Sequence, residues 1–326
     1  MEKLSKIIGI DEKKCVNCHK CIAACPVKFC NDGSKDHVSI NENLCVGCGN
    51  CLTACTHEAR YIIDDFGDFL DGLMKKEKSI AFVAPSVVVH FPEEYLKFNG
   101  WLKSLGIEAI FDVSFGAELT VKSYINHILK NRPKTVISQP CPAIVTYIQI
   151  YKPQLIKHLA PVHSPMLHAI KMVKNFYPEY KNHKITVISP CIAKKREFEE
   201  TGLGDYNVTF ESIINYIDEK KIKISAFKET EYSNPPAERA VVFSTPGGLL
   251  ETALREVKDI NKKTRKIEGP SVIYDYLETF SEAIEKNAQP LLVDCLNCEK
   301  GCNGGTATKT KNLPADRKST RLNSSH

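Results

Sequence analysis

The sequence contains fourteen cysteines, and nine of them lie between Cys15 and Cys55. These nine include two copies of one pattern, CVNCHKCIAACP from Cys15 to Pro26 and CVGCGNCLTACT from Cys45 to Thr56. Three closely spaced thiolates can bind three irons of a cubane, and in a doubled pattern the fourth cysteine of each run binds the other cluster. We therefore predict two [4Fe-4S] clusters that carry single electrons.

The ligand sets follow from this crossover, which resembles that of bacterial two-cluster ferredoxins. The predicted ligands are Cys15, Cys18, Cys21 and Cys55 for cluster 1, and Cys45, Cys48, Cys51 and Cys25 for cluster 2. Two structural zinc sites are the alternative interpretation, but zinc does not require a doubled, interlocked pattern. Cys30 belongs to neither run, and we interpret it as a free buried thiol, with an additional cluster ligand as the alternative.

Five further cysteines lie in three separate segments, SQPCPAIV (138–145), SPCIAKKREFE (189–199) and LVDCLNCEKGCNGG (292–305). A single cysteine in such a place is more often a small core residue than a ligand. Four of the five, however, give the number of thiolates that one cubane needs. We predict a third [4Fe-4S] cluster bound by Cys141, Cys191, Cys298 and Cys302. Cys295 is interpreted as a small buried residue, with a contact to the cofactor as the alternative.

Short β-rich runs alternate with helical patterns in the rest of the chain. The predicted strands are 79–85, 109–114, 135–138, 184–189, 240–248 and 290–294, and the run 64–78 predicts a linking helix. Such alternation predicts an α+β or α/β fold with mostly parallel sheets flanked by helices. Cys141, Cys191 and the last three cysteines each follow a predicted strand, which is where open α/β sheets bind ligands.

The three later cysteine segments resemble the signature motifs of the [FeFe]-hydrogenase catalytic domain. The passages SIAFVAPSV, IFDVSFGAELT, YKPQLIKHLAPVHSP and VVFSTPGGLLETALR match that family as well, so the resemblance runs from about Ser79 to Gly305. It implies a two-cluster ferredoxin-like domain at residues 1–62, a linker helix at 63–78 and an iron-hydrogenase-like domain at 79–315.

The resemblance also implies roles for individual residues. Cys302 would bridge the third cluster to a diiron subsite that carries CO and CN⁻ ligands. Lys194 would hold one cyanide by a charge-assisted hydrogen bond, and Glu197 would anchor the loop. A solvated surface lysine is the alternative for Lys194. The glycines Gly301, Gly304 and Gly305 would let the backbone approach the cofactor closely.

The sequence departs from the family where protons would be delivered. Pro140 occupies the position of a thiol, Ala160 that of a serine, and Tyr124 and His127 those of two glutamates. Near the expected diiron site, two methionines are replaced by Ser189 and Leu296, and a glutamine is replaced by Met166. Since positioned acid–base groups typically contribute about 10²- to 10⁴-fold in rate, this pattern predicts slow turnover.

Slow turnover with retained cluster ligands resembles the sensory [FeFe]-hydrogenase-like proteins of anaerobic bacteria. The leading hypothesis is therefore a sensor of H₂ or redox state, or a low-turnover hydrogenase, and the sequence leaves open whether the chain is an enzyme. The first alternative is an active H₂-evolving or H₂-oxidising hydrogenase with a proton route through His127 or His163. The second is a non-catalytic [4Fe-4S] electron-transfer or scaffold protein without the diiron subsite.

Composition limits the partners and the compartment. A net charge of +5 without a block of basic residues argues against nucleic acid, and no apolar run is long enough for a membrane span. Without a recognisable signal peptide, many unpaired cysteines predict a reducing cytoplasm. We expect a ferredoxin-type electron donor or acceptor, or a signalling domain after Ala315. The segment 316–326 resembles a translated sequencing adapter, and we exclude it.

Overall fold

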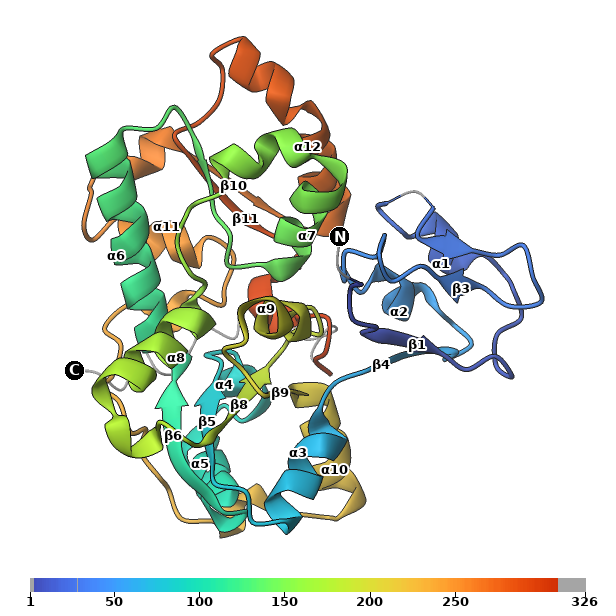
Figure 1. The fold of residues 1–326 in the computed structure, drawn as a ribbon, viewed down its shortest axis with the longest axis vertical. Helices are drawn as coiled ribbons and strands as arrows, with labels where there is room; N and C mark the ends of the chain where they lie inside the picture. Colours follow the sequence, from blue (N-terminus) through green and yellow to red (C-terminus); the bar gives the residue numbers. More distant parts are fainter. Residues whose placement is uncertain (1–2, 28, 310–326) are drawn as a thin grey trace.

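The computed structural model describes residues 3–27 and 29–309. The predicted domain end at Ala315 and the adapter-like segment 316–326 lie outside the described residues. Figure 1 shows a small N-terminal unit, in blue, beside a larger body made of two lobes. Each lobe of the larger body contains its own sheet, and α9 (Lys194–Thr201) lies between them.

The helices follow the chain in this order. They are α1 (Lys20–Ala23), α2 (Asn50–Ala54), α3 (Phe66–Met74), α4 (Val87–His90), α5 (Tyr95–Ser104), α6 (Val113–Asn131), α7 (Pro142–Tyr151), α8 (Pro165–Phe176), α9, α10 (Phe210–Glu219), α11 (Gly248–Ala253) and α12 (Pro270–Glu285). Short 3-10 helices span Pro153–His158, Pro178–Tyr180, Ile224–Ala226, Ala240–Val242, Ile260–Lys263 and Gly301–Gly304.

The N-terminal unit repeats its sequence pattern in three dimensions. The strand β1 (Ile8–Ile10) pairs antiparallel with β4 (Arg60–Ile62), and β2 (Asn31–Asp32) pairs antiparallel with β3 (Ser39–Ile40). The helices α1 and α2 carry the third cysteine of each run, and each begins after a residue in the left-handed region. The two runs therefore fold alike, as an internal repeat predicts.

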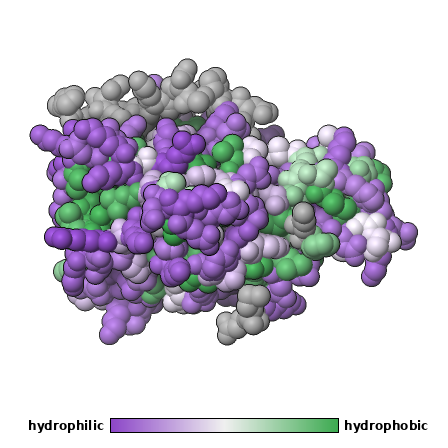
Figure 2. All heavy atoms as spheres, turned by 90° about the horizontal axis from the view of Figure 1, so that it is seen from above, coloured by the Kyte–Doolittle hydropathy of each residue, from purple (hydrophilic) through white to green (hydrophobic). Residues whose placement is uncertain are grey.

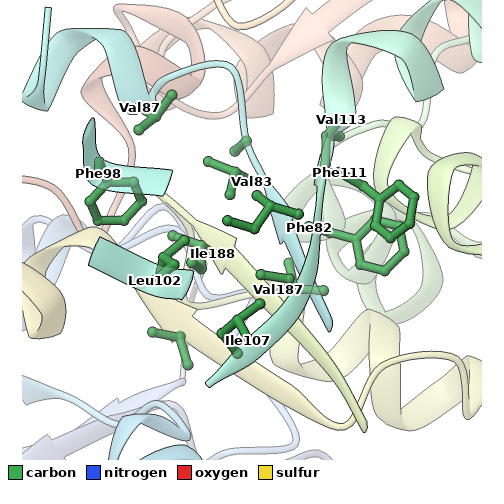
Figure 3. Packing of buried hydrophobic residues seen from close by; sticks show 14 of the residues in the cluster. Phe82, Val83, Val87, Phe98, Leu102, Ile107, Phe111, Val113, Val187 and Ile188 are labelled. Atoms are coloured by element: carbon green, nitrogen blue, oxygen red, sulfur yellow. The ribbon is translucent and has the colours of Figure 1, made fainter. Parts of the chain in front are cut away.

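The first lobe is built on a four-stranded parallel sheet. Its order is β6 (Ile107–Asp112), β5 (Ser79–Val83), β8 (Lys184–Ser189) and β9 (Tyr206–Thr209). All five residues of β5 are buried, as in parallel strands that are covered on both faces. Figure 3 shows side chains of this core, including Phe82 and Phe111, whose rings stack with centroids 5.2 Å apart.

The second lobe contains a three-stranded parallel sheet. Its order is β10 (Thr264–Glu268), β11 (Leu292–Leu296) and β7 (Val136–Ile137). Tyr147 of α7 and Tyr274 of α12 pack in its core, with ring centroids 4.7 Å apart. The predicted architecture, a ferredoxin-like unit followed by mostly parallel sheets flanked by helices, is confirmed.

One predicted strand is wrong. The segment 240–248 forms the 3-10 helix Ala240–Val242 and then enters α11. The carboxylate of Glu118 accepts hydrogen bonds from the backbone N–H groups of Arg239 and Ala240, which fixes a helical turn instead of a sheet ladder. A short apolar run is equally compatible with a strand and with a helical turn, so the contact with Glu118 determines which of the two forms. The strands β9 and β10 were not predicted.

The surface carries mainly polar side chains. Figure 2 shows a face that is largely hydrophilic, with hydrophobic residues in separate small groups. Among the described residues, no helix has both the length and the apolar character that crossing a bilayer would require.

Candidate metal centre

Five cysteines line one internal cavity of the N-terminal unit. They are the predicted cluster 2 ligands Cys25, Cys45, Cys48 and Cys51, together with Cys30. Protein atoms leave about 300 Å³ free at this place, a volume that includes space open to solvent. Cys25 of the first run therefore lies beside three cysteines of the second run, where the predicted crossover needs it, and Cys30 lies in the same set.

The thiols of this cavity differ in how readily they ionise: a hydrogen bond with the Cys30 thiol lowers the pKa of Cys25 to about 7 and that of Cys45 to about 6, whereas burial makes Cys48 and Cys51 difficult to ionise without a metal. Burial raises the pKa of Cys51 to about 12, and the neighbouring Cys45, Cys25 and Cys21 raise it further. Metal binding requires the thiolate, and the iron cations of a bound cluster would stabilise the negative charges of these buried thiolates. In the described part of the chain, no three His, Cys, Asp or Glu side chains meet closely enough for a lone metal ion. A cubane instead binds each thiolate to a separate iron.

The cluster 1 cysteines occupy the equivalent positions of the first run. Cys21 is buried in α1, Cys15 is half-buried and Cys18 is exposed. Cys55 ends α2, much as Cys25 follows α1. These residues stay a predicted ligand set, and their partial exposure would place cluster 1 nearer to solvent than cluster 2.

The structure brings the four later cysteines together from three strand ends. Cys141 precedes α7, Cys191 follows β8, and Cys298 and Cys302 follow β11. Burial raises the pKa of Cys302 to about 12, and the negative charges of Cys141 and Cys191 add to the shift. The same two residues and Cys302 also raise the pKa of Cys298, after the larger effect of burial.

The glycines of the last motif pack against neighbouring loops. Gly301 has φ +61°, and a Cβ there would stand 2.5 Å from the carbonyl oxygen of Ser244. A Cβ on Gly305 would stand 2.3 Å from the carbonyl oxygen of Pro190, directly before Cys191. Gly301 therefore lets the Cys302 loop approach the segment 244–246, and Gly305 lets it approach the Cys191 loop, roles that the sequence did not reveal. The third glycine, Gly304, stands against Lys300.

A second cavity lies where strands of both sheets end. Its lining includes Ala84, Pro85 and Ser86 after β5, Val113 after β6, Pro140 after β7, Ser189 to Cys191 at the end of β8, Leu296 of β11, and Met166, Lys194 and Cys302. It encloses about 560 Å³ of space free of protein atoms, part of it open to solvent. Every residue that replaces an expected diiron neighbour is therefore found in this wall.

Lys194 is buried rather than solvated, which excludes the surface-lysine interpretation. Its Nζ donates to Glu197 Oε2 at 2.5 Å, to Ser164 Oγ at 3.2 Å and to the carbonyl oxygen of Pro140 at 3.3 Å. The ammonium group is therefore held at the cavity wall by protein partners. Glu197 supplies the charge that makes this burial tolerable.

The positions of the expected proton relay contain no relay. Tyr124 is buried, and its hydroxyl accepts a hydrogen bond from the backbone N–H of Gln139 at 3.0 Å. Burial raises its pKa well above the usual range, so it stays protonated at neutral pH. Among the described residues, the cavity wall contains no Asp, Glu or His. His127 contacts Asn131, and His163 contacts Lys171 and interacts electrostatically with Glu197, the partner of Lys194; neither imidazole is among the lining residues.

The helix α9 links the cavity to the N-terminal unit through three consecutive basic residues. Lys194 faces the cavity, Lys195 pairs with Asp65 before α3, and Arg196 donates to the carbonyl oxygen of Cys45. Arg196 also donates to the carbonyl oxygen of Ser5 at 3.2 Å. Sequence analysis missed the role of Arg196 because its partners lie in another unit.

Asn297 makes a second connection between the units. Its side-chain amide donates to the carbonyl oxygen of Cys48 at 3.1 Å and to the sulfur of Cys298 at 3.5 Å. Its Oδ1 accepts a hydrogen bond from the hydroxyl of Tyr274 at 2.7 Å. A buried side chain thus joins a predicted cluster 2 ligand to a predicted ligand of the third cluster. Cys295, by contrast, lies in β11 with its sulfur beside Ser138.

Arg60 is a further buried residue that the motifs did not indicate. Its Nη2 donates to Cys21 Sγ at 3.1 Å and to Asn31 Oδ1 at 3.0 Å. No ion pair within the described residues includes Arg60, and its buried Nη1 has no hydrogen-bond partner there. A buried guanidinium next to a predicted ligand sulfur fits an anionic iron–sulfur cluster at that place.

The cysteine-lined cavities and the paired parallel sheets define an iron–sulfur protein of the hydrogenase-like class. The chain belongs to the family described as iron only hydrogenase large subunit, C-terminal domain, whose model matches residues 77–306. A 4Fe-4S dicluster domain matches residues 7–56. The expected family is confirmed.

The chain is similar to proteins named as hydrogenases and to proteins named as iron–sulfur cluster assembly factors. Iron hydrogenase 1 of Clostridium pasteurianum is 27% identical over 301 residues, which cover 79% of this chain and 52% of the relative. The chain therefore spans about half the length of that protein. The cytosolic Fe-S cluster assembly factor NAR1 of Encephalitozoon cuniculi is 22% identical and covers 67% of this chain and 65% of the relative.

Solved structures of [FeFe]-hydrogenases have a similar fold. A variant of the [FeFe]-hydrogenase of Chlamydomonas reinhardtii superposes with a TM-score of 0.61 at 18% identity, covering 80% of this chain and 87% of that chain. At this identity the likeness establishes the fold alone.

Proposed function

We propose that the chain binds three [4Fe-4S] clusters and passes single electrons between them. Clusters 1 and 2 would use the two ferredoxin-type runs, and the third would use Cys141, Cys191, Cys298 and Cys302. The five-cysteine cavity supports cluster 2, and the electrostatic coupling of the four later thiols supports the third. An exposed Cys18 suits an exchange of electrons with a ferredoxin-type partner at cluster 1.

We propose further that the cavity beside Cys302 holds the diiron subsite. Cys302 would bridge it to the third cluster, and Lys194 would offer its ammonium group to a cyanide ligand. The space at the joined strand ends and Lys194, the one basic side chain among the described lining residues, support this assignment. When bound, this group would supply interconversion of H₂ with protons and electrons.

The function that this site supports best is sensing of H₂ or redox state, or hydrogenase activity with low turnover. The observation that carries the proposal is the cavity wall, in which Pro140 replaces a thiol and no carboxylate or imidazole lies among the described lining residues. A proton leaving the cavity would therefore find no carboxylate or imidazole in the described wall to accept it. A signalling domain after the described chain would receive the output of such a sensor.

Infrared spectroscopy after anaerobic maturation with the diiron assembly factors tests this proposal. Bands of CO and CN⁻ that disappear in Cys302→Ala support the diiron subsite, and their absence in correctly folded protein with three clusters overturns it. H₂ evolution with a reduced viologen dye then separates the hypotheses. Slow turnover is expected, whereas turnover at the rate of a matched active hydrogenase would support the active alternative.

A second candidate is a non-catalytic iron–sulfur carrier or scaffold without the diiron subsite. The specific observation in its favour is the internal pairing of Lys194, whose ammonium group already has three protein partners. The similarity to a protein named as a cluster assembly factor agrees with this candidate. Three clusters with no CO or CN⁻ bands, under conditions that load a hydrogenase control, would establish it.

A further inference from the structure

Arg60 lies between the two cysteine runs of the N-terminal unit. It is the first residue of β4 and pairs with Ile10 of β1, and 8% of its surface is exposed. Its guanidinium reaches inward to Cys21 of the first run, with 3.1 Å between Nη2 and Sγ. It also lowers the pKa of Cys51 in the second run, against the larger opposite effect of burial.

The neighbours of Arg60 do not balance its charge. Asn31 accepts one hydrogen bond at 3.0 Å, but an amide oxygen is neutral. None of the ion pairs in residues 3–27 and 29–309 includes Arg60, and Nη1 is buried without a partner. A guanidinium remains charged in proteins, so its burial without an anion is strongly unfavourable. The structure therefore requires negative charge beside Arg60, and the thiolates of the two runs are the groups that can supply it.

The binding of a cluster would supply that charge. A cubane core with two positive charges and four thiolates is a dianion, and the gain of one electron makes it a trianion. A fixed cation stabilises the trianion more than the dianion. A hydrogen bond to a ligand sulfur acts in the same direction, because the potential of such clusters depends on hydrogen bonds to their sulfurs.

We propose that Arg60 raises the reduction potential of cluster 1, and that it raises this potential more than it raises that of cluster 2. The direct contact with Cys21, a predicted cluster 1 ligand, selects that cluster. The step is the transfer of one electron from a low-potential one-electron donor to the cluster, with no bond broken and no proton moved. This inference rests on the proposed presence of both clusters.

The test is an anaerobic redox titration of wild-type protein and Arg60→Gln, followed by electron paramagnetic resonance. The signal altered by Cys18→Ala is assigned to cluster 1. In Arg60→Gln we expect the ratio of reduced to oxidised cluster 1 at a fixed potential to fall by about tenfold or more, which is about 59 mV for one electron. Cluster 2 should move less, and the third cluster should not move.

Two further variants complete the experiment. Arg60→Lys keeps the charge but not the planar fork, so it should recover much of the lost potential. Arg265→Gln removes an exposed arginine of β10 and should leave every midpoint unchanged. Unchanged midpoints in both Arg60 variants, or a larger shift on cluster 2, would overturn the inference.

Iron and sulfide content distinguishes a failure of the proposed function from a failure of the Arg60 inference. Wild-type protein without two clusters in residues 3–62 would contradict the proposed function. If Arg60→Gln alone lost a cluster, the Arg60→Lys titration would still decide the inference, because loss of the guanidinium hydrogen bond to Cys21 should lower the cluster 1 midpoint more than that of cluster 2.

Discussion

The side-chain amide of Asn297 donates a hydrogen bond to the carbonyl oxygen of Cys48 at 3.1 Å. The two residues are 249 positions apart in the sequence, and they belong to different structural units. Because the same amide reaches Cys298 Sγ, Asn297 forms a hydrogen-bonded link between a predicted ligand of cluster 2 and a predicted ligand of the third cluster. Asn297 therefore holds the Cys48 and Cys298 segments of the two units together.

Replacement of Asn297 by Leu should weaken this junction. Leucine has a similar size but leaves the hydroxyl of Tyr274 and the carbonyl oxygen of Cys48 without their partner, at a cost of about 2 kcal/mol. We expect a lower thermal midpoint and slower reduction of the third cluster after rapid reduction of the first two, followed by stopped-flow absorbance. Asn261→Leu, at an exposed position, is the control. Unchanged internal electron transfer would exclude the positioning role.

Lys194 and Glu197 should behave as one buried pair. Lys194→Met leaves the Glu197 carboxylate without its cation, and breaking a buried pair costs about 3 kcal/mol or more. The double variant Lys194→Met/Glu197→Gln should recover much of that loss, as chemical denaturation under anaerobic conditions would measure. Additive losses in the double variant would show that the two side chains act independently.

The cysteines of β11 and its following loop allow a matched comparison of ligand and core positions. Cys298→Ala should remove one cluster, a loss of about four irons per chain. Cys295→Ala should retain the full iron content, because the Cys295 sulfur contacts Ser138 in the core. Iron and acid-labile sulfide analysis would measure both. Equal iron losses in the two variants would contradict the ligand assignment.

Asp294 should make stability depend on pH. Burial raises its pKa from a usual value of 3.8 to about 7, and the N–H of Leu250 opposes this shift only in part. The folded state therefore binds the proton more tightly than the unfolded state. The contribution of protonated Asp294 to the free energy of unfolding is complete below pH 4 and is lost as the pH rises through 7. The free energy of unfolding should change by on the order of 4 kcal/mol over this range.

The variant Asp294→Asn isolates this contribution. An amide can still accept the hydrogen bond from Leu250 but does not titrate. We expect the thermal midpoint of the variant to exceed that of the wild type at pH 8 and to approach it at pH 5. Scanning calorimetry at matched scan rates would measure the difference. A constant difference between the two proteins across this range would contradict a titrating Asp294.

Sequence patterns predicted the parts of the fold that depend on local order. The run KITVIS was predicted as a strand at 184–189, and β8 has those bounds, because a short β-branched run after a polar turn has few alternatives. The strand order, in which β8 lies between β5 and β9, could not be derived from the same runs. It depends on packing between segments that lie far apart.

The cysteine motifs indicated a candidate site, but not the residues that support it. Regular spacing distinguishes a ligand run from a random set of cysteines, whereas Arg60, Arg196 and Asn297 occur singly. Each acts on a residue at least 39 positions away, with 39 between Arg60 and Cys21 and 151 between Arg196 and Cys45. Only the folded chain brings these partners together.

The Arg196 contact also has a consequence for synthesis of the chain. Arg196 fixes the Cys45 loop, but it is translated 151 residues later. At roughly 5–20 residues per second, the N-terminal unit waits on the order of ten seconds before its partner helix emerges. During that interval the loop around Cys45 is open to solvent and to whatever delivers iron and sulfide. Docking of α9 then closes this face, so the order of translation favours loading of the N-terminal unit before the units join.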